Sequence, residues 1–105
     1  GGLFFFFFIN EFVKMAYNKG EDPNLSFWRD STGNEVDLLL TEGGKQYAYE
    51  IKSGATYSTD FFKGISKWAK LSNTPSERCY TIYNGENIKT SQGDVLSWGG
   101  KSTLA

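Results

Sequence analysis

Residues 35–53 read EVDLLLTEGGKQYAYEIKS, two short apolar segments joined by the pair Gly43-Gly44. Two strand-like segments separated by Gly-Gly predict a β-hairpin with a two-residue turn, because such turns need positive φ angles that glycine adopts at little steric cost. With the turn at Gly43-Gly44, Asp37 lies directly opposite Glu50. Facing Cβ atoms are roughly 4.5–5.5 Å apart, and like charges placed there are destabilising. The pattern therefore indicates a carboxylate pair that needs a cation.

The same register sorts the hairpin residues into two faces, because strand side chains alternate. We expect the first face to be core, since its facing residues are all apolar: Val36 with Ile51, Leu38 with Tyr49, and Leu40 with Tyr47. The second face carries Glu35, Asp37, Ala48, Glu50 and Lys52. A slip of one residue would lose both patterns together, so the faces support the register.

Length and composition bound the class of protein. The chain has 105 residues, which predicts one domain, and its 17% aromatic content supplies a substantial apolar core. The formal net charge is −1, so no overall positive field indicates a nucleic-acid partner, and any such contact must be local.

The chain has no histidine and a single cysteine, Cys79. Histidine-based catalysis, the usual structural zinc sites and an internal disulfide are therefore excluded within this chain. Carboxylates, lysines and a hard metal ion remain for chemistry, and a reducing, cytoplasmic location is the simplest interpretation. The apolar stretch at residues 3–9 is too short to cross a bilayer, which takes about 20 residues. Because the chain lacks an initiator Met, we expect it to be a fragment of a longer protein.

Periodicity predicts the remaining elements. Apolar residues at helical spacing indicate helices at residues 3–18 and 59–71, the second with Ser58 or Thr59 as N-cap. Gly64 weakens the second helix by about 1 kcal/mol relative to Ala, which suggests close packing there. Strands are expected at residues 25–29 and 77–83, and the chain is expected to finish with a short segment near Ile88 and a polar, Gly-rich tail. The order is helix, three-stranded meander, helix, strand.

The carboxylate pair suggests metal-assisted phosphodiester hydrolysis. Mg²⁺ is held by one or two carboxylates together with waters and substrate phosphate. Asp37 and Glu50 would be those ligands, with the carbonyl of Ile51 as a further oxygen, and Lys52 would orient the attacking water or stabilise developing negative charge. Acidic residues on the wet side of a hairpin are nevertheless common, and spacing alone favours a purely structural role.

A family resemblance changes that balance. The segments at residues 33–40 and 49–54, set between two helices and followed by a strand, resemble the PD-(D/E)XK nuclease superfamily. The closest likeness is to the nuclease-like domain at the C-terminus of prokaryotic AAA-type ATPases, where the Phe-Trp-Arg-Asp segment at residues 27–30 is also typical. The resemblance implies a restriction-endonuclease-like α/β (α+β) core, a central mixed sheet flanked by helices. It also implies Asp37 and Glu50 as ligands of Mg²⁺ or Mn²⁺, and Lys52 as the catalytic lysine.

The sequence departs from that family at one position. The family often has an acid on its first helix, whereas this chain has Phe5 there, although a second helical acid, Glu11, is retained. Glu11 and Glu35 are therefore accessory candidates, and Glu35 faces Lys52 in the predicted register.

Phosphate contacts are the remaining candidates. Lys63, Lys67 and Lys70 form a basic stripe on the second helix that is suited to backbone phosphates or is simply a solvated face. Arg29 would bind phosphate or an acidic neighbour. Trp28, Trp68 and Cys79 are expected to be core residues.

Two functions follow. The first is Mg²⁺-dependent DNA phosphodiester hydrolysis by a domain attached to an ATPase of the same parent chain. The second is a catalytically inactive nuclease-fold module that serves DNA binding or protein contact. An unrelated α+β binding domain would require the hairpin register to be coincidental.

Overall fold

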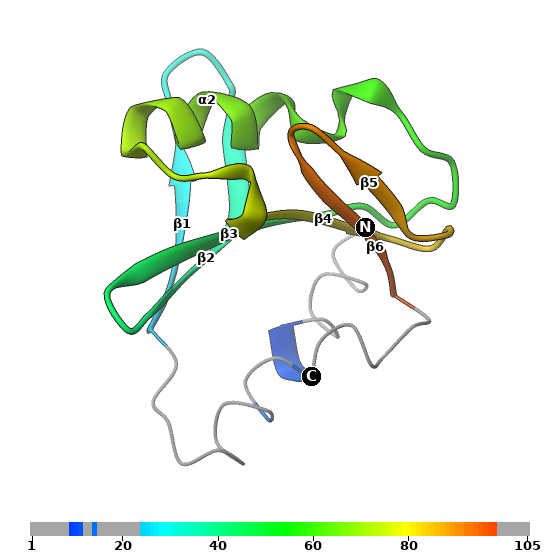
Figure 1. The fold of residues 1–105 in the computed structure, drawn as a ribbon, viewed down its shortest axis with the longest axis horizontal. Coiled ribbons are helices and arrows are strands. Elements are labelled where there is room, and N and C mark those ends of the chain that lie inside the picture. Colours follow the sequence, from blue (N-terminus) through cyan, green and yellow to red (C-terminus); the bar gives the residue numbers. More distant parts are fainter. Residues whose placement is uncertain (1–8, 12–13, 15–23, 99–105) are drawn as a thin grey trace.

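The computed structural model describes residues 9–11, 14 and 24–98. Residues 9–11 and 14 are helical, and most of the helix predicted at residues 3–18, including Phe5, lies outside the described residues. The fold is mixed α+β (Figure 1). Its elements in chain order are β1 (Asn24–Arg29), β2 (Glu35–Glu42), β3 (Lys45–Ile51), the 3-10 turn η1 (Thr59–Phe62), α2 (Lys63–Ser72), the 3-10 turn η2 (Ser76–Arg78), β4 (Cys79–Tyr83), β5 (Ile88–Thr90) and β6 (Gly93–Ser97).

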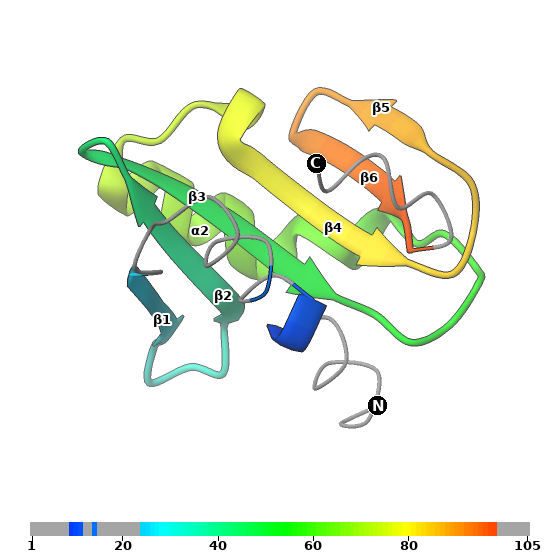
Figure 2. The ribbon, with the colours of Figure 1, turned by 90° about the horizontal axis from the view of Figure 1, so that it is seen from below.

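The six strands form one mixed sheet in the order β1-β2-β3-β4-β6-β5. The first three strands make the predicted antiparallel meander. The chain then crosses through α2 to β4, which runs parallel to β3, and β6 runs parallel to β4. Figure 2 shows α2 on one face of the sheet and residues 9–11 on the other. Ile9 packs there against Leu38, Leu40 and Ile82.

The predicted hairpin register is confirmed from Leu38, which pairs with Tyr49, to Glu42, which pairs with Lys45. Gly43 and Gly44 have φ angles of 59° and 78°, as a two-residue turn of this kind requires. The ladder does not continue to Asp37. Pairing between β1 and β2 shifts between Ser26 and Trp28, so that Asp37 and Leu38 together lie opposite Phe27. This extra residue is a β-bulge, which bends the strand locally.

The bulge corrects the predicted faces. Val36 packs with Leu39 and Ala48 in the core beneath α2, whereas Leu38 and Leu40 pack on the opposite face. The expected apolar face of Val36, Leu38 and Leu40 is therefore wrong at Val36, because the inserted residue reverses the alternation. The expected polar face is not exposed to solvent at every residue. Ala48, which belongs to it, is fully buried in the core beneath α2.

Helix α2 and the η1 turn that precedes it are positioned by a shared apolar stripe and by one glycine. Phe61, Phe62, Ile65 and Trp68 are buried against the sheet, and the Ser58 side chain caps the start of η1 by accepting a hydrogen bond from the Asp60 N–H. The packing expected at Gly64 is confirmed, since a Cβ atom there would overlap the carbonyl oxygen of Glu35. The helix thus rests directly on the backbone at the start of β2.

The expected polar tail is wrong, because residues 93–97 form β6 inside the sheet. Val95 is fully buried, and Gly93 packs so closely on the Cys79 carbonyl that a side chain would not fit. The predicted core roles of three other residues are confirmed. Trp68 and Cys79 are buried, and Trp28 packs against the same core. Among the described residues, no helix has the length and apolar character needed to span a bilayer.

Candidate active site

The carboxylates of Asp37 and Glu50 each accept a backbone hydrogen bond from the neighbouring strand just beyond the point where the β2–β3 ladder ends. The backbone N–H of Ile51 donates to Oδ2 of Asp37 at 2.9 Å, and the backbone N–H of Asp37 donates to Oε1 of Glu50 at 3.1 Å. Side-chain oxygens thus accept N–H groups beyond the last ladder pair, Leu38 with Tyr49. The two carboxyl groups are also close enough for a hydrogen bond between their side chains.

The environment of Glu50 disfavours its charged form. The residue is only 8% exposed. Burial, followed by the hydrogen bond and the negative charge of the neighbouring Asp37 side chain, raises the pKa of Glu50 to about 8. The positive charge of Lys52 acts in the opposite direction. A buried carboxylate beside a second carboxylate accepts either a proton or a cation.

Lys52 places an ammonium group beside the pair. Its backbone N–H donates to the carbonyl of Ile82 at 2.8 Å, which ties the end of β3 to β4. Its Nζ lies 3.7 Å from Oε2 of Glu50, and its side chain is 42% exposed. The lysine therefore reaches both solvent and the carboxylate pair, as a group that meets an incoming substrate must.

The donor set fits a hard divalent cation. Mg²⁺ is commonly bound through one or two carboxylates, with waters and substrate oxygens completing its shell. Asp37 and Glu50 supply the carboxylates, and the Ile51 carbonyl belongs to the same segment. Within residues 9–11, 14 and 24–98, no group of three His, Cys, Asp or Glu side chains is suitably clustered. The pair would therefore bind through two side chains and leave most of the shell to water and substrate.

The accessory acids lie outside this pair. Glu35, predicted to face Lys52, instead forms an ion pair with Arg29, whose Nε lies 3.4 Å from Oε2 of Glu35. Arg29 was predicted to bind either phosphate or an acidic neighbour, and the structure shows the acidic neighbour, Glu35. Glu11 is exposed and forms an ion pair with Lys14 at 3.5 Å.

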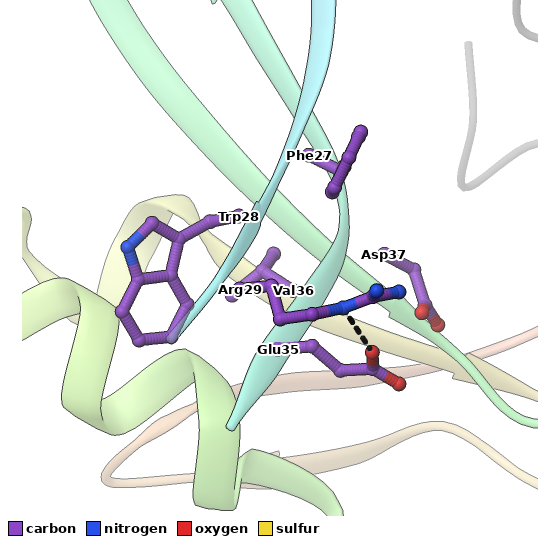
Figure 3. A pocket seen from close by; sticks show the side chains of 6 residues that line it. All are labelled: Phe27, Trp28, Arg29, Glu35, Val36 and Asp37. Carbon is purple, nitrogen blue, oxygen red and sulfur yellow. Dashed lines mark ion pairs between the residues drawn. The ribbon is translucent and has the colours of Figure 1, made fainter. Parts of the chain in front are cut away.

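A pocket adjoins Asp37 on the outer side of the bulge. Figure 3 shows Phe27, Arg29, Glu35 and Asp37 projecting to the same side of β1 and β2, while Trp28 points toward α2. The pocket has a volume of about 220 Å³. Phe27 is 67% exposed, and the guanidinium carbon of Arg29 lies 5.8 Å from the centre of its ring. The sequence did not indicate that Phe27 would line a pocket with Asp37, because the bulge that sets the two residues opposite each other has no marker in the strand pattern.

Residues 1–99 match the family model described as "Domain of unknown function (DUF4143)". The chain belongs to the DUF4143 family. A search of curated proteins finds no match to it.

The lysines of α2 have different environments in this DUF4143 domain. The Nζ of Lys67 lies 2.7 Å from Oδ2 of Asp30 in an ion pair. This ion pair links α2 to the β1–β2 loop. Lys63 and Lys70 are exposed. The basic stripe is therefore interrupted at its middle residue, whose charge already has a partner.

Asp30 organises the loop that precedes the bulge. Its Oδ1 accepts hydrogen bonds from the backbone N–H groups of Thr32 and Asn34, at 3.0 and 2.9 Å. The Lys67 ammonium, followed by these loop donors, holds the pKa of Asp30 well below its usual range. The loop sequence Asp-Ser-Thr-Gly-Asn predicts a turn, and an Asp that bonds to the backbone two residues on is typical of such turns. Nothing in the sequence indicated Lys67 as the partner.

Proposed function

We propose that this DUF4143 domain hydrolyses DNA phosphodiester bonds with the help of Mg²⁺ or Mn²⁺. One observation carries the proposal: the carboxylates of Asp37 and Glu50 converge at the end of the β2–β3 ladder, with the ammonium of Lys52 3.7 Å from Glu50. Two carboxylates and a lysine are the groups that the PD-(D/E)XK resemblance implies.

Each residue has a chemical role in this proposal. Asp37 and Glu50 hold the cation, with the Ile51 carbonyl as a further oxygen ligand. When bound, the cation supplies positive charge to the scissile phosphate and lowers the pKa of water. Lys52 orients the attacking water through a hydrogen bond and stabilises negative charge that develops on the phosphate.

The strand order supports a restriction-endonuclease-like core. An antiparallel meander of β1, β2 and β3 leads through α2 to the parallel strand β4, and the carboxylates lie on the second and third strands of the meander. In the ATPase proteins that this sequence resembles, such a domain follows the ATPase domain. The proposal therefore includes an ATPase domain of the same parent chain as a partner and DNA as the substrate.

A second function is favoured by one observation. Within the part of the chain that the structure describes, no third acidic side chain joins the pair, and Glu35 is engaged by Arg29. A domain with an incomplete ligand set would serve as a catalytically inactive module for DNA binding or protein contact. The two functions predict different outcomes in a cleavage assay.

Nicking of supercoiled plasmid DNA in Mg²⁺ or Mn²⁺ tests the proposal. Asp37→Asn and Glu50→Gln each retain an oxygen that can accept the observed backbone hydrogen bond, so they remove charge with little change in structure. We expect these variants and Lys52→Met to lower the nicking rate by roughly 100-fold or more. Glu42→Gln and Lys45→Met, at the turn end of the same hairpin, are matched controls that should nick normally. A folded chain that binds Mn²⁺ without nicking would support the inactive module instead.

A further inference from the structure

Phe27 is an exposed aromatic residue in an unusual position. It lies on the edge strand β1, opposite the two bulge residues Asp37 and Leu38, and 67% of its surface is exposed. Its neighbour Trp28 packs beneath α2, as an aromatic strand residue ordinarily does. The bulge therefore sets a solvent-exposed aromatic ring on the strand opposite Asp37, and both residues line the same pocket.

Arg29 is held next to that ring in a defined orientation. Its guanidinium lies over the Phe27 ring, with Cζ 5.8 Å from the centroid, and its Nε faces Glu35. Among the described residues, no other ion pair or hydrogen bond involves this side chain, which is 65% exposed. A guanidinium has five N–H donors. The Nη groups of Arg29 are thus available to an anion, while Glu35 fixes the direction of the side chain.

We propose that Phe27 and Arg29 form a nucleotide subsite beside the carboxylate pair, where the base of an unpaired nucleotide stacks on Phe27 and a neighbouring phosphate contacts Arg29. This inference rests on the proposed function, because it places the subsite on the substrate that the carboxylates would cleave. Asp37 lines the pocket and is one of the two carboxylates of the proposed cation site, so the pocket adjoins that site.

The inference defines a substrate class. A base inside a continuous duplex must be unstacked and unpaired before it can reach an aromatic side chain, at a cost of a few kcal/mol. Single strands and unpaired ends avoid that cost. The subsite therefore favours single-stranded DNA over duplex DNA of the same length.

The charges of the pocket make this binding depend on a divalent cation. Two carboxylates, Glu35 and Asp37, line the pocket with one guanidinium, so the empty pocket repels phosphate. A cation on Asp37 and Glu50 reverses that balance. Ca²⁺, which accepts carboxylate ligands at flexible geometry, allows binding to be measured apart from cleavage.

The experiment is equilibrium binding of the chain to a fluorescein-labelled oligothymidylate and to a duplex of equal length, by fluorescence anisotropy in Ca²⁺. Stacking on an aromatic side chain is worth about 1–3 kcal/mol per base, so Phe27→Ala should weaken single-strand binding roughly 5- to 150-fold. Phe27→Trp should retain it. Leu71→Ala, which removes a comparably exposed apolar side chain on α2, is the matched control and should bind normally.

Three results would overturn the subsite. The first is unchanged single-strand binding by folded Phe27→Ala, and the second is an equal loss on single-stranded and duplex DNA. The third is a concentration-dependent dimer of the wild-type chain that Phe27→Ala dissociates, which would assign Phe27 to a protein interface. Asp37→Asn and EDTA test the cation separately. If neither changes binding and no DNA is nicked, the proposed function and the cation dependence of binding both fail, while the Phe27 result still decides whether a nucleotide stacks at this position.

Discussion

Gly64 of α2 lies directly on the backbone carbonyl of Glu35 at the start of β2. The helix and the strand approach so closely that no side chain fits between them. Glu35 is two residues before Asp37, so this contact fixes the position of the segment that enters the bulge. The core beneath α2 and the carboxylate pair are therefore coupled through two residues of backbone.

The Gly64 contact predicts that Gly64→Ala destabilises the chain, whereas Gly→Ala in a helix usually stabilises. Gly→Ala inside a helix ordinarily stabilises by about 1 kcal/mol. Here the new methyl group overlaps the Glu35 carbonyl, and such overpacking costs typically 1–3 kcal/mol. We expect Gly64→Ala to lower the free energy of unfolding in urea. Gly54→Ala is the control, because a Cβ atom at Gly54 meets nothing within 4 Å and should change stability by less than about 0.5 kcal/mol. Equal or higher stability of Gly64→Ala would refute the close contact.

The ion pair between Lys67 and Asp30 predicts that one lysine of α2 matters for stability and two do not. Lys67→Met should lower the melting temperature, whereas Lys63→Met and Lys70→Met should leave it nearly unchanged. Because the pKa of Asp30 is depressed in the folded chain, the contribution is present above the ordinary aspartate pKa and is lost as the pH falls below it. Thermal unfolding of the wild-type chain and Lys67→Met from pH 7 down to about pH 2 measures this, because the loss continues well below the ordinary aspartate pKa. Indistinguishable melting of the three variants would contradict the assignment.

Glu50 predicts the opposite dependence on pH. Its pKa is raised to about 8 in the folded chain, so between the ordinary glutamate pKa and about 8 the folded state binds the extra proton. Stability from this group is complete below that window and is lost as the pH rises through it. In EDTA, Glu50→Gln should therefore be more stable than wild type at pH 8 to 9, by roughly 1–3 kcal/mol. Glu42→Gln should follow the wild-type profile. Parallel profiles for wild type and Glu50→Gln would exclude the shift.

Cation binding should also depend on pH, because it competes with the proton on Glu50. A cation must displace the proton from Glu50, so its apparent affinity rises with pH up to about 8 and binding releases protons. Mn²⁺ should raise the melting temperature of the wild-type chain more at pH 8 than at pH 6. The reverse order would contradict a role for Glu50 as a ligand.

Cys79 provides an independent test of the sheet. Its thiol is buried, donates to the Pro75 carbonyl at 3.6 Å, and has a pKa that burial raises to about 11. A thiolate reacts far faster than a thiol. We expect slow reaction with a disulfide reagent in the native chain and rapid reaction in urea. Because this is the only cysteine in the sequence, fast native labelling would show directly that β4 is accessible.

Local patterns predicted much of the fold. The Gly-Gly turn fixed the register from Leu38 to Glu42, and the helical spacing of Phe61, Ile65 and Trp68 located α2. Gly64 indicated close packing because glycine is otherwise unfavourable in a helix. These features depend on residues near one another in the chain, where periodicity and turn chemistry act.

Long-range features were not predictable. The bulge at Asp37 depends on how β1 pairs with β2. The sequence pattern did not reveal it, so the predicted side of the sheet for Val36 was wrong. β6 looks polar and contains a glycine, yet it is buried because its neighbours are β4 and β5 and its Gly93 meets the Cys79 carbonyl. The proximity of Asp37 and Glu50 was expected from the register. Hydrogen bonds from the backbone N–H groups of Ile51 and Asp37 to the two carboxylates, however, replace the ladder that the register assumed.

The most direct test of the carboxylate pair is calorimetric titration of Mn²⁺ into the wild-type chain, Asp37→Asn and Glu42→Gln at pH 8. Asp37→Asn retains an oxygen for the Ile51 N–H and removes one of the two charges that would hold the cation. We expect one saturable site in the wild-type chain and in Glu42→Gln, and its loss in folded Asp37→Asn. Saturable binding that Asp37→Asn leaves undiminished, or no saturable binding by the wild-type chain, would contradict the claim that Asp37 and Glu50 hold a divalent cation.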